Sequence, residues 1–121
     1  MSVTKSTKEN TVSYSLGEEI ILEASFEKHE ETTLKIKGVI KTLVAPYFSE
    51  VIKDALSRNE PITIDFSEVT YIASAGLRVL LDMQQLIDEG EKPEIEIANI
   101  TESVKEVFEQ TGFINILNIK S

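Results

Sequence analysis

The stretch ITIDFSEVTYIASAGLRVLL, residues 62–81, constrains the fold of this chain more than any other part of the sequence. Its first five residues alternate between apolar and polar side chains, which is typical of a strand. The residues that follow, 67–70, are polar except for Val69 and predict a loop. From Ser74 onward the apolar positions recur with the period of a helix, to about residue 87. A strand that leads through a short loop into a helix is the repeating unit of α/β proteins.

The segments before this stretch predict a hairpin and a helix. Residues 20–27 and 32–39 alternate like strands around a short polar link, which favours an antiparallel pair. Residues 43–56 carry paired apolar positions every four residues and predict a helix that includes Leu43 in its apolar stripe. Pro46 is expected in its first turn, where the missing N–H costs little.

The segments after it continue the alternation of strands and helices. Residues 94–97 predict a strand, and Val104, Val107 and Phe108 predict the apolar side of a third helix. Residues 113–119 are expected to contain a last strand. The order β-β-α-β-α-β-α-β predicts a single α/β domain. Its mixed β-sheet has an antiparallel N-terminal hairpin and otherwise parallel strands, and helices pack on the sheet.

Length and composition set limits on this domain. The chain has 121 residues, so one domain is expected. Residues 1–15 are polar and predict a flexible tail, which leaves residues 16–121 for the domain. No apolar run approaches the length needed to cross a bilayer, so no membrane insertion is expected. The net charge of −9 argues against nucleic acid and anionic membrane as partners.

Ser74 is the first candidate for a functional residue. At the start of a helix its hydroxyl can cap a free backbone N–H, and the helix dipole favours negative charge there. Ala73 and Ala75 keep its surroundings small, and Gly76 is expected to let another chain approach the backbone closely. Tyr71, just before this site, is expected to anchor the loop in the core. These residues alone leave two readings open, an ordinary helix cap and a serine that is modified or recognised.

Catalysis, metal binding and cofactor binding have little support in the sequence. The G-x-S-x-G pattern of a nucleophile elbow is absent, and the single histidine, His29, falls in the predicted hairpin turn. The acidic residues lack histidine or cysteine companions, and the chain has no cysteine. No glycine-rich phosphate-binding motif occurs. We therefore expect no enzyme activity, no metal and no cofactor.

The segment from residue 62 to residue 80 resembles the signature of the STAS domain family. That family contains bacterial anti-sigma factor antagonists and the cytoplasmic domains of sulfate transporters. Its typical pattern is an aliphatic strand, D-[LF]-S-x-[VL], an aromatic residue, and then aliphatic-x-S-[STA]-G-[LI]. The match here covers about twenty residues, and the predicted order of elements extends it from about residue 20 to the C-terminus. The chain looks like the stand-alone antagonist type.

The resemblance implies a function as a cytoplasmic anti-sigma factor antagonist that regulates transcription by partner switching. In such proteins the serine that matches Ser74 is phosphorylated by a serine kinase, which is itself the anti-sigma factor. The unphosphorylated antagonist binds that kinase, phosphorylation releases it, and a PP2C-type phosphatase restores it. The residues expected to contact the partner are Lys41, Thr42, Ser67, Glu68, Thr70, Ala73, Ser74, Ala75, Gly76, Arg78 and Asp82.

Two positions depart from the pattern of the antagonists. Ala73 stands where many of them carry Asp, and Lys41 stands where many carry an acidic residue. The alternative is a STAS interaction subunit of a transporter or another signalling complex that is not switched. In that case Ser74 would be only a helix cap.

Overall fold

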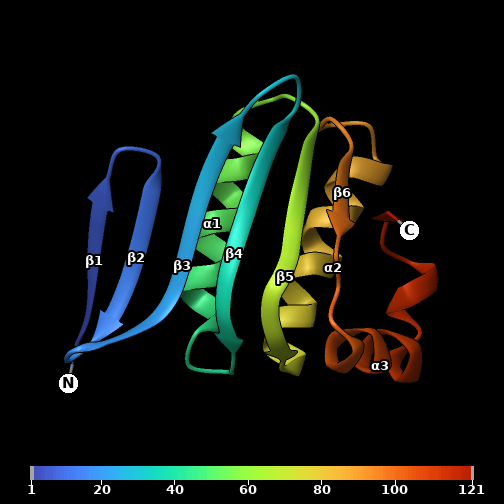
Figure 1. Cartoon of the computed structure of the whole chain (residues 1–121). Coiled ribbons are helices and arrows are strands. Elements are labelled where there is room, and N and C mark those ends of the chain that lie inside the picture. Colours follow the sequence, from blue (N-terminus) through green and yellow to red (C-terminus); the bar gives the residue numbers. More distant parts are fainter. Residues whose placement is uncertain (1, 121) are drawn as a thin grey trace.

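The computed structural model describes residues 2–120 as one seven-stranded sheet with helices packed against one face (Figure 1). The strands lie in the sheet in chain order, from β1 at one edge to β7 at the other. The elements are β1 (Val3–Lys8), β2 (Thr11–Leu16), β3 (Glu19–Lys28), β4 (Thr32–Ile40), α1 (Ala45–Ser57), β5 (Ile62–Ile72), α2 (Ser74–Asp88), β6 (Ile95–Ala98), α3 (Glu102–Thr111), a 3₁₀ turn (Phe113–Asn115) and β7 (Ile119–Lys120).

The predicted mixed sheet is confirmed. Strands β1 to β4 pair antiparallel, and β4 to β7 pair parallel. Helices α1 and α2 lie behind the sheet in Figure 1, and their apolar sides form the core with alternate residues of the strands. Phe48 and Leu80 are fully buried at this interface, as is Ile64 from the middle of β5. The opposite face of the sheet carries polar side chains at the alternate positions.

The prediction of a flexible tail over residues 1–15 is wrong for the residues that the structure describes. Strands β1 and β2 form a hairpin that extends the antiparallel part of the sheet. The hairpin packs on α1: Tyr14 is 2% exposed, its ring centroid lies 5.1 Å from that of Tyr47, and Lys5 Nζ lies 4.0 Å from a Glu50 carboxylate oxygen. Met1 and Ser121, the ends of the predicted tail and domain, lie outside the described residues.

The sequence of this hairpin does contain a strand signal, an alternation of apolar and polar residues, although its overall composition is polar. Val12, Tyr14 and Leu16 alternate with smaller polar residues along β2. Only one of these side chains, Tyr14, is buried, because the hairpin lies at the margin of the core. Alternation over six residues therefore carried more information than the overall polarity of the segment.

Three other predicted boundaries also change. The strand predicted at residues 62–66 continues through the presumed loop to Ile72. The first helix begins at Ala45, with Pro46 in its first turn as predicted, so Leu43 lies before the helix and is exposed. The last strand is only Ile119–Lys120, after a 3₁₀ turn. None of the helices in residues 2–120 combines the length and apolar character required to cross a membrane.

Candidate functional site

Strand β5 reaches the site by way of two irregularities in its pairing with β4. Lys35 pairs with Asp65, but two residues further along β4 the partner is three residues further along β5, at Glu68. A second shift occurs after the pair of Gly38 and Val69. Each shift adds one residue to β5, as a β-bulge does. For this reason the alternation of apolar and polar residues ends at Phe66, and the sequence of the segment that follows predicts a loop although it is a strand.

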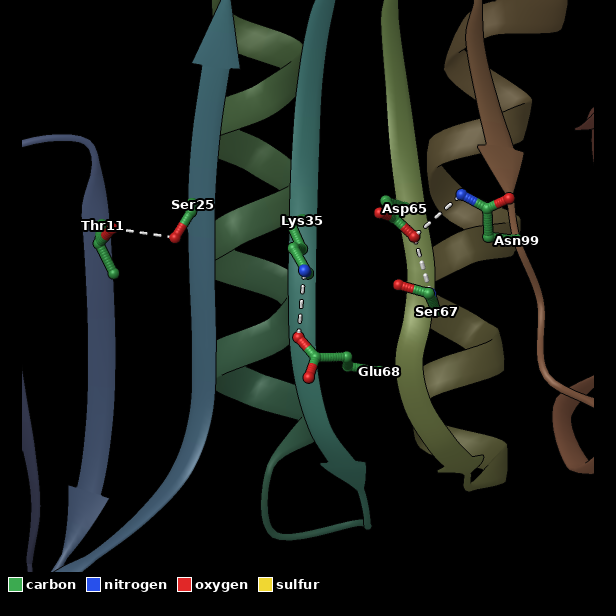
Figure 2. A network of polar contacts seen from close by, with 7 residues as sticks. All are labelled: Thr11, Ser25, Lys35, Asp65, Ser67, Glu68 and Asn99. Atoms are coloured by element: carbon green, nitrogen blue, oxygen red, sulfur yellow. Dashed lines mark hydrogen bonds and ion pairs between the residues drawn. The ribbon is translucent and has the colours of Figure 1, made fainter.

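The first bulge is held by a carboxylate on the open face of the sheet (Figure 2). Asp65 Oδ1 accepts hydrogen bonds from the backbone N–H of Ser67 at 2.8 Å and from Asn99 Nδ2 at 3.2 Å. Burial raises the pKa of Asp65, but these hydrogen bonds and the nearby Lys35 outweigh it and hold the pKa below its usual value. Asp65 therefore fixes both the bulge and the connection that follows β6.

A second tie holds the far end of β5. The Thr101 hydroxyl donates to the backbone carbonyl of Val69 at 2.8 Å, and the same oxygen accepts from the N–H of Val104 as the N-cap of α3. Helix α3 is thereby attached to the part of β5 that leads to Ser74. The β6–α3 connection therefore holds β5 at two points, Asp65 and Val69, on its way to Ser74.

Ser74 is the first residue of α2 rather than its cap, which corrects one of the two sequence readings. The N-cap is Ala73, in an extended conformation and without a side-chain cap. The Ala73 N–H donates to the carbonyl of Ile40 at 2.8 Å, and its own carbonyl accepts from Gly76 and Leu77. Within residues 2–120 the N–H groups of Ser74 and Ala75 are left without a backbone partner, as expected at a helix N-terminus.

Gly76 has an internal role, contrary to the expectation that it admits another chain. It is buried, and a Cβ atom built there would lie 2.7 Å from Ile72 Cγ1 and 2.9 Å from Ile40 Cγ2. The missing side chain lets the first turn of α2 pack directly on the ends of β4 and β5. Ser74 is then held at a fixed position at the end of the sheet, with its side chain exposed.

The structure brings some of the predicted contact residues together with Ser74. Lys41 and Thr42 are exposed and follow Ile40, the residue whose carbonyl binds the Ala73 N–H. Arg78 and Asp82 continue from Ser74 along one side of α2 at intervals of four residues, and they form an ion pair at 3.1 Å. These side chains share one end of the sheet and the helix that begins there.

Ser67, Glu68 and Thr70 are placed differently from a loop at this site. All three are exposed on β5, and Glu68 pairs with Lys35 at 3.3 Å (Figure 2). A strand advances ~3.3 Å per residue, so Glu68, at the sixth position before Ser74, lies up to about 20 Å from it. Ser67 and Glu68 therefore belong to the open face of the sheet, and the immediate surroundings of Ser74 come from other residues.

Exposed apolar side chains at the Ser74 end of the sheet were missed by sequence reasoning. Tyr71, expected in the core, is 47% exposed and pairs across the sheet with Val39, which is 39% exposed. Ile20 and Leu43 add two more, each 56% exposed. All four come from strand ends or loops at the end of the sheet where α2 begins (Figure 1). Exposed apolar residues gathered in this way are typical of interaction surfaces.

The only histidine lies at the other end of the sheet. His29 is in the β3–β4 turn, whereas Ser74 follows the opposite end of β4 and β5. A serine nucleophile needs a base within hydrogen-bond reach. The fold therefore does not bring the one histidine to Ser74.

Comparison with known proteins agrees with this fold. A family model described as "Mlab, STAS domain" matches residues 25–118, which is most of the chain. No match is found among curated proteins.

Solved structures that resemble the chain include three anti-sigma factor antagonists. The one from Mycobacterium paratuberculosis is 18% identical, with a TM-score of 0.71 over 81% of this chain and 84% of that chain. A putative one from Thermotoga maritima is 18% identical, with a TM-score of 0.66 over 81% and 86%. SpoIIAA of Bacillus in its unphosphorylated form is 15% identical, with a TM-score of 0.61 over 81% and 88%. At these identities the likeness concerns the fold.

Proposed function

The chain belongs to the STAS domain family, and on this premise we propose that it is an anti-sigma factor antagonist switched by phosphorylation of Ser74. When unphosphorylated, it binds an anti-sigma serine kinase through the end of the sheet at which α2 begins. The kinase transfers a phosphoryl group to Ser74 and releases the protein. A PP2C-type phosphatase removes the phosphate, so the chain is a cytoplasmic substrate and binding module rather than an enzyme.

One observation carries this proposal: an exposed serine hydroxyl is held rigidly beside exposed apolar side chains. Gly76 and the Ala73 hydrogen bond fix the backbone at Ser74, while Tyr71 and Val39 give a partner apolar surface to bury. Phosphorylation by a kinase requires the accessible hydroxyl, and binding of a protein partner requires the exposed apolar side chains. The similar solved structures include SpoIIAA in a form named as phosphorylated, which supports a switch of this kind.

The switch would act through charge. A phosphate adds roughly −1.5 to −2 charges at neutral pH. The free N–H groups of Ser74 and Ala75 and the nearby Arg78 favour this charge within the protein itself. Across the interface the same charge would meet the kinase's nucleotide phosphates and acidic groups, where repulsion costs several kcal/mol. Phosphorylation therefore leaves the fold intact and weakens the complex.

The proposal is tested with the anti-sigma serine kinases encoded in the same genome. Each purified kinase is incubated with the protein and ATP, and the phosphorylated residue is identified by mass spectrometry. We expect one phosphate on Ser74, none on Ser74→Ala, and unchanged phosphorylation of Ser6→Ala, which alters an exposed serine in β1. Phosphate on another residue, or phosphorylation of Ser74→Ala to the wild-type level, would overturn the assignment.

The alternative function is an interaction subunit of a transporter or another signalling complex that lacks the switch. The observation that favours it is Ala73, which stands where many antagonists carry Asp. In that case the same surface binds its partner whether or not Ser74 is charged. Ser74→Asp would then bind as tightly as the wild type, whereas the switch requires that it bind much more weakly.

A further inference from the structure

An open groove of about 370 Å³ lies on the hairpin side of the Ser74 end of the sheet. One side, which we call the hairpin wall, comes from the β2–β3 turn and consists of Leu16, Glu19 and Ile20. The other side, the loop wall, comes from the connection between β4 and α1 and consists of Lys41, Leu43 and Val44. Both walls lie beyond the last pair of β3 with β4, which joins Glu23 to Lys37.

The floor of the groove depends on a glycine. Gly38 has a φ of 148°, and a Cβ atom there would lie 2.9 Å from the carbonyl oxygen of Ile21. Any side chain at this position would push β3 and β4 apart or fill the groove. The floor of the groove therefore requires a glycine at position 38.

Three of the side chains that line the groove are both apolar and exposed. Ile20 on the hairpin wall and Leu43 on the loop wall are each 56% exposed, with Val39 between them. Single exposed apolar residues are ordinary, but several of them around one groove mark a surface that is covered in use.

The charges on the two walls have opposite signs. Glu19 lies on the hairpin wall and Lys41 on the loop wall, and both are exposed. Neither takes part in an ion pair with another residue in the range 2–120. Each wall therefore carries an exposed apolar side chain and an unpaired charge. The charge of one wall is opposite in sign to that of the other, so the two walls are complementary.

We propose that this groove is a self-association surface, occupied by a second copy of the chain in a two-fold dimer. A two-fold axis along the groove sets the hairpin wall of each copy against the loop wall of its partner. Ile20 then meets the partner's Leu43, and Glu19 meets the partner's Lys41. An axis across the groove would set Glu19 against the partner's Glu19, so the charges select the first arrangement.

A second copy of the chain fits the groove, because each copy carries both complementary surfaces, the hairpin wall and the loop wall. The hairpin wall lies before residue 25, where the match to the family begins, and the loop wall lies inside the matched segment. The inference does not depend on phosphorylation of Ser74 and requires no kinase.

Sedimentation equilibrium from micromolar to millimolar concentration tests the proposal. The wild type is expected to shift from the mass of one chain to that of two. Leu43→Glu and Ile20→Glu should weaken the dimer about a hundredfold, because each substitution occurs twice in the interface. Ile116→Glu is the matched control, since Ile116 is 45% exposed but lies outside the groove, and it should dimerise like the wild type. Circular dichroism confirms that each variant is folded.

Charge exchange and cross-linking test the arrangement of the two copies. Glu19→Lys and Lys41→Glu should each weaken the dimer about tenfold, and the double variant should regain most of the affinity. Because the chain has no cysteine, Ile20→Cys mixed with Leu43→Cys should give a disulfide-linked pair, while Ile20→Cys alone should not. A wild type that stays monomeric at millimolar concentration, or a Leu43→Glu variant that dimerises like the wild type, would overturn the proposal.

Discussion

The carboxylate of Asp65 accepts a hydrogen bond from the backbone N–H of Ser67 at 2.8 Å, at the point where β5 first shifts its register against β4. A carboxylate that bonds to an N–H two residues ahead stabilises a local bend in the chain. Here the bend is a bulge in a strand. Asp65 therefore determines which side chains of β5 face the core as the strand approaches Ser74.

Asp65→Asn is expected to destabilise the protein by ~1 kcal/mol at neutral pH, since a charged acceptor of two hydrogen bonds is lost. The folded-state pKa of Asp65 is lowered, so its contribution is present above the ordinary carboxyl pKa and disappears as pH falls through the lowered value. The difference between variant and wild type should therefore shrink below about pH 4. Urea unfolding over a pH series measures it.

Glu68→Gln is the control for Asp65→Asn. Glu68 lies on the same face but makes one half-exposed ion pair, with Lys35, so the cost should stay within ~0.5 kcal/mol. If the two variants lose the same free energy of unfolding, Asp65 does not stabilise the bulge more than an ordinary surface ion pair does.

Gly76→Ala is expected to destabilise the protein by ~1–3 kcal/mol, because the added methyl group must displace Ile72 and Ile40. Alanine normally favours a helix, so a loss of stability would identify packing as the reason for the glycine. Gly17→Ala is the control: its φ is 64° with no atom nearby, and strain alone should cost ~1 kcal/mol. A Gly76→Ala protein as stable as the wild type would contradict the close packing of α2.

Ser74→Asp is expected to stabilise the folded protein by ~0.5–1 kcal/mol, since the dipole of α2 stabilises a negative charge in the first turn of the helix. Arg78, four residues later, should contribute ~0.3 kcal/mol of that gain. Chemical denaturation of Ser74→Asp, Arg78→Ala and the double variant measures the coupling, with Ser74→Asn as the neutral control. A destabilised Ser74→Asp would mean that the helix start does not accept the charge of a phosphate.

Tyr14 should make the stability of the protein sensitive to alkaline pH. Burial, and then the carboxylates of Glu50 and Asp54, raise its pKa to about 12. The phenol is thus harder to ionise when folded, so its contribution is complete below about pH 10 and is lost as pH rises through the folded value. Stability should fall by up to ~3 kcal/mol over this range, and Tyr14→Phe should remove most of the fall.

Tyr47→Phe controls for the aromatic contact, because Tyr47 is the other ring of the pair. It should keep the alkaline fall of the wild type. If Tyr14→Phe and the wild type lose stability in parallel, the hairpin is not packed on α1 as the structure has it.

The helices and the central strands could be predicted because their apolar periodicity reflects burial on one face. The prediction failed where local pairing departs from a regular pattern. The alternation of apolar and polar residues in β5 stops at Phe66, because the bulge held by Asp65 adds a residue to the strand. The part of β5 that follows therefore has the sequence pattern of a loop. Residues 1–15 were predicted as a tail, whereas residues 3–15 lie within the β1–β2 hairpin, which is at the margin of the core and buries only Tyr14.

The candidate site could be predicted in part. Ser74 was found because a strand followed at once by a helix exposes the residue between them. The sequence could not show that Ala73 is the cap, since the choice depends on the backbone hydrogen bond to Ile40. Nor could it show that Tyr71 is exposed, because the second register shift in β5 determines the direction of that side chain.

The central claim is that charge on Ser74 controls binding at this end of the sheet. Isothermal titration of the cognate anti-sigma kinase with the unphosphorylated protein and with the protein phosphorylated on Ser74 tests it most directly. We predict tight binding of the first and binding at least about a hundredfold weaker for the second, which corresponds to a few kcal/mol of repulsion. Equal affinities for the two forms would contradict the switch.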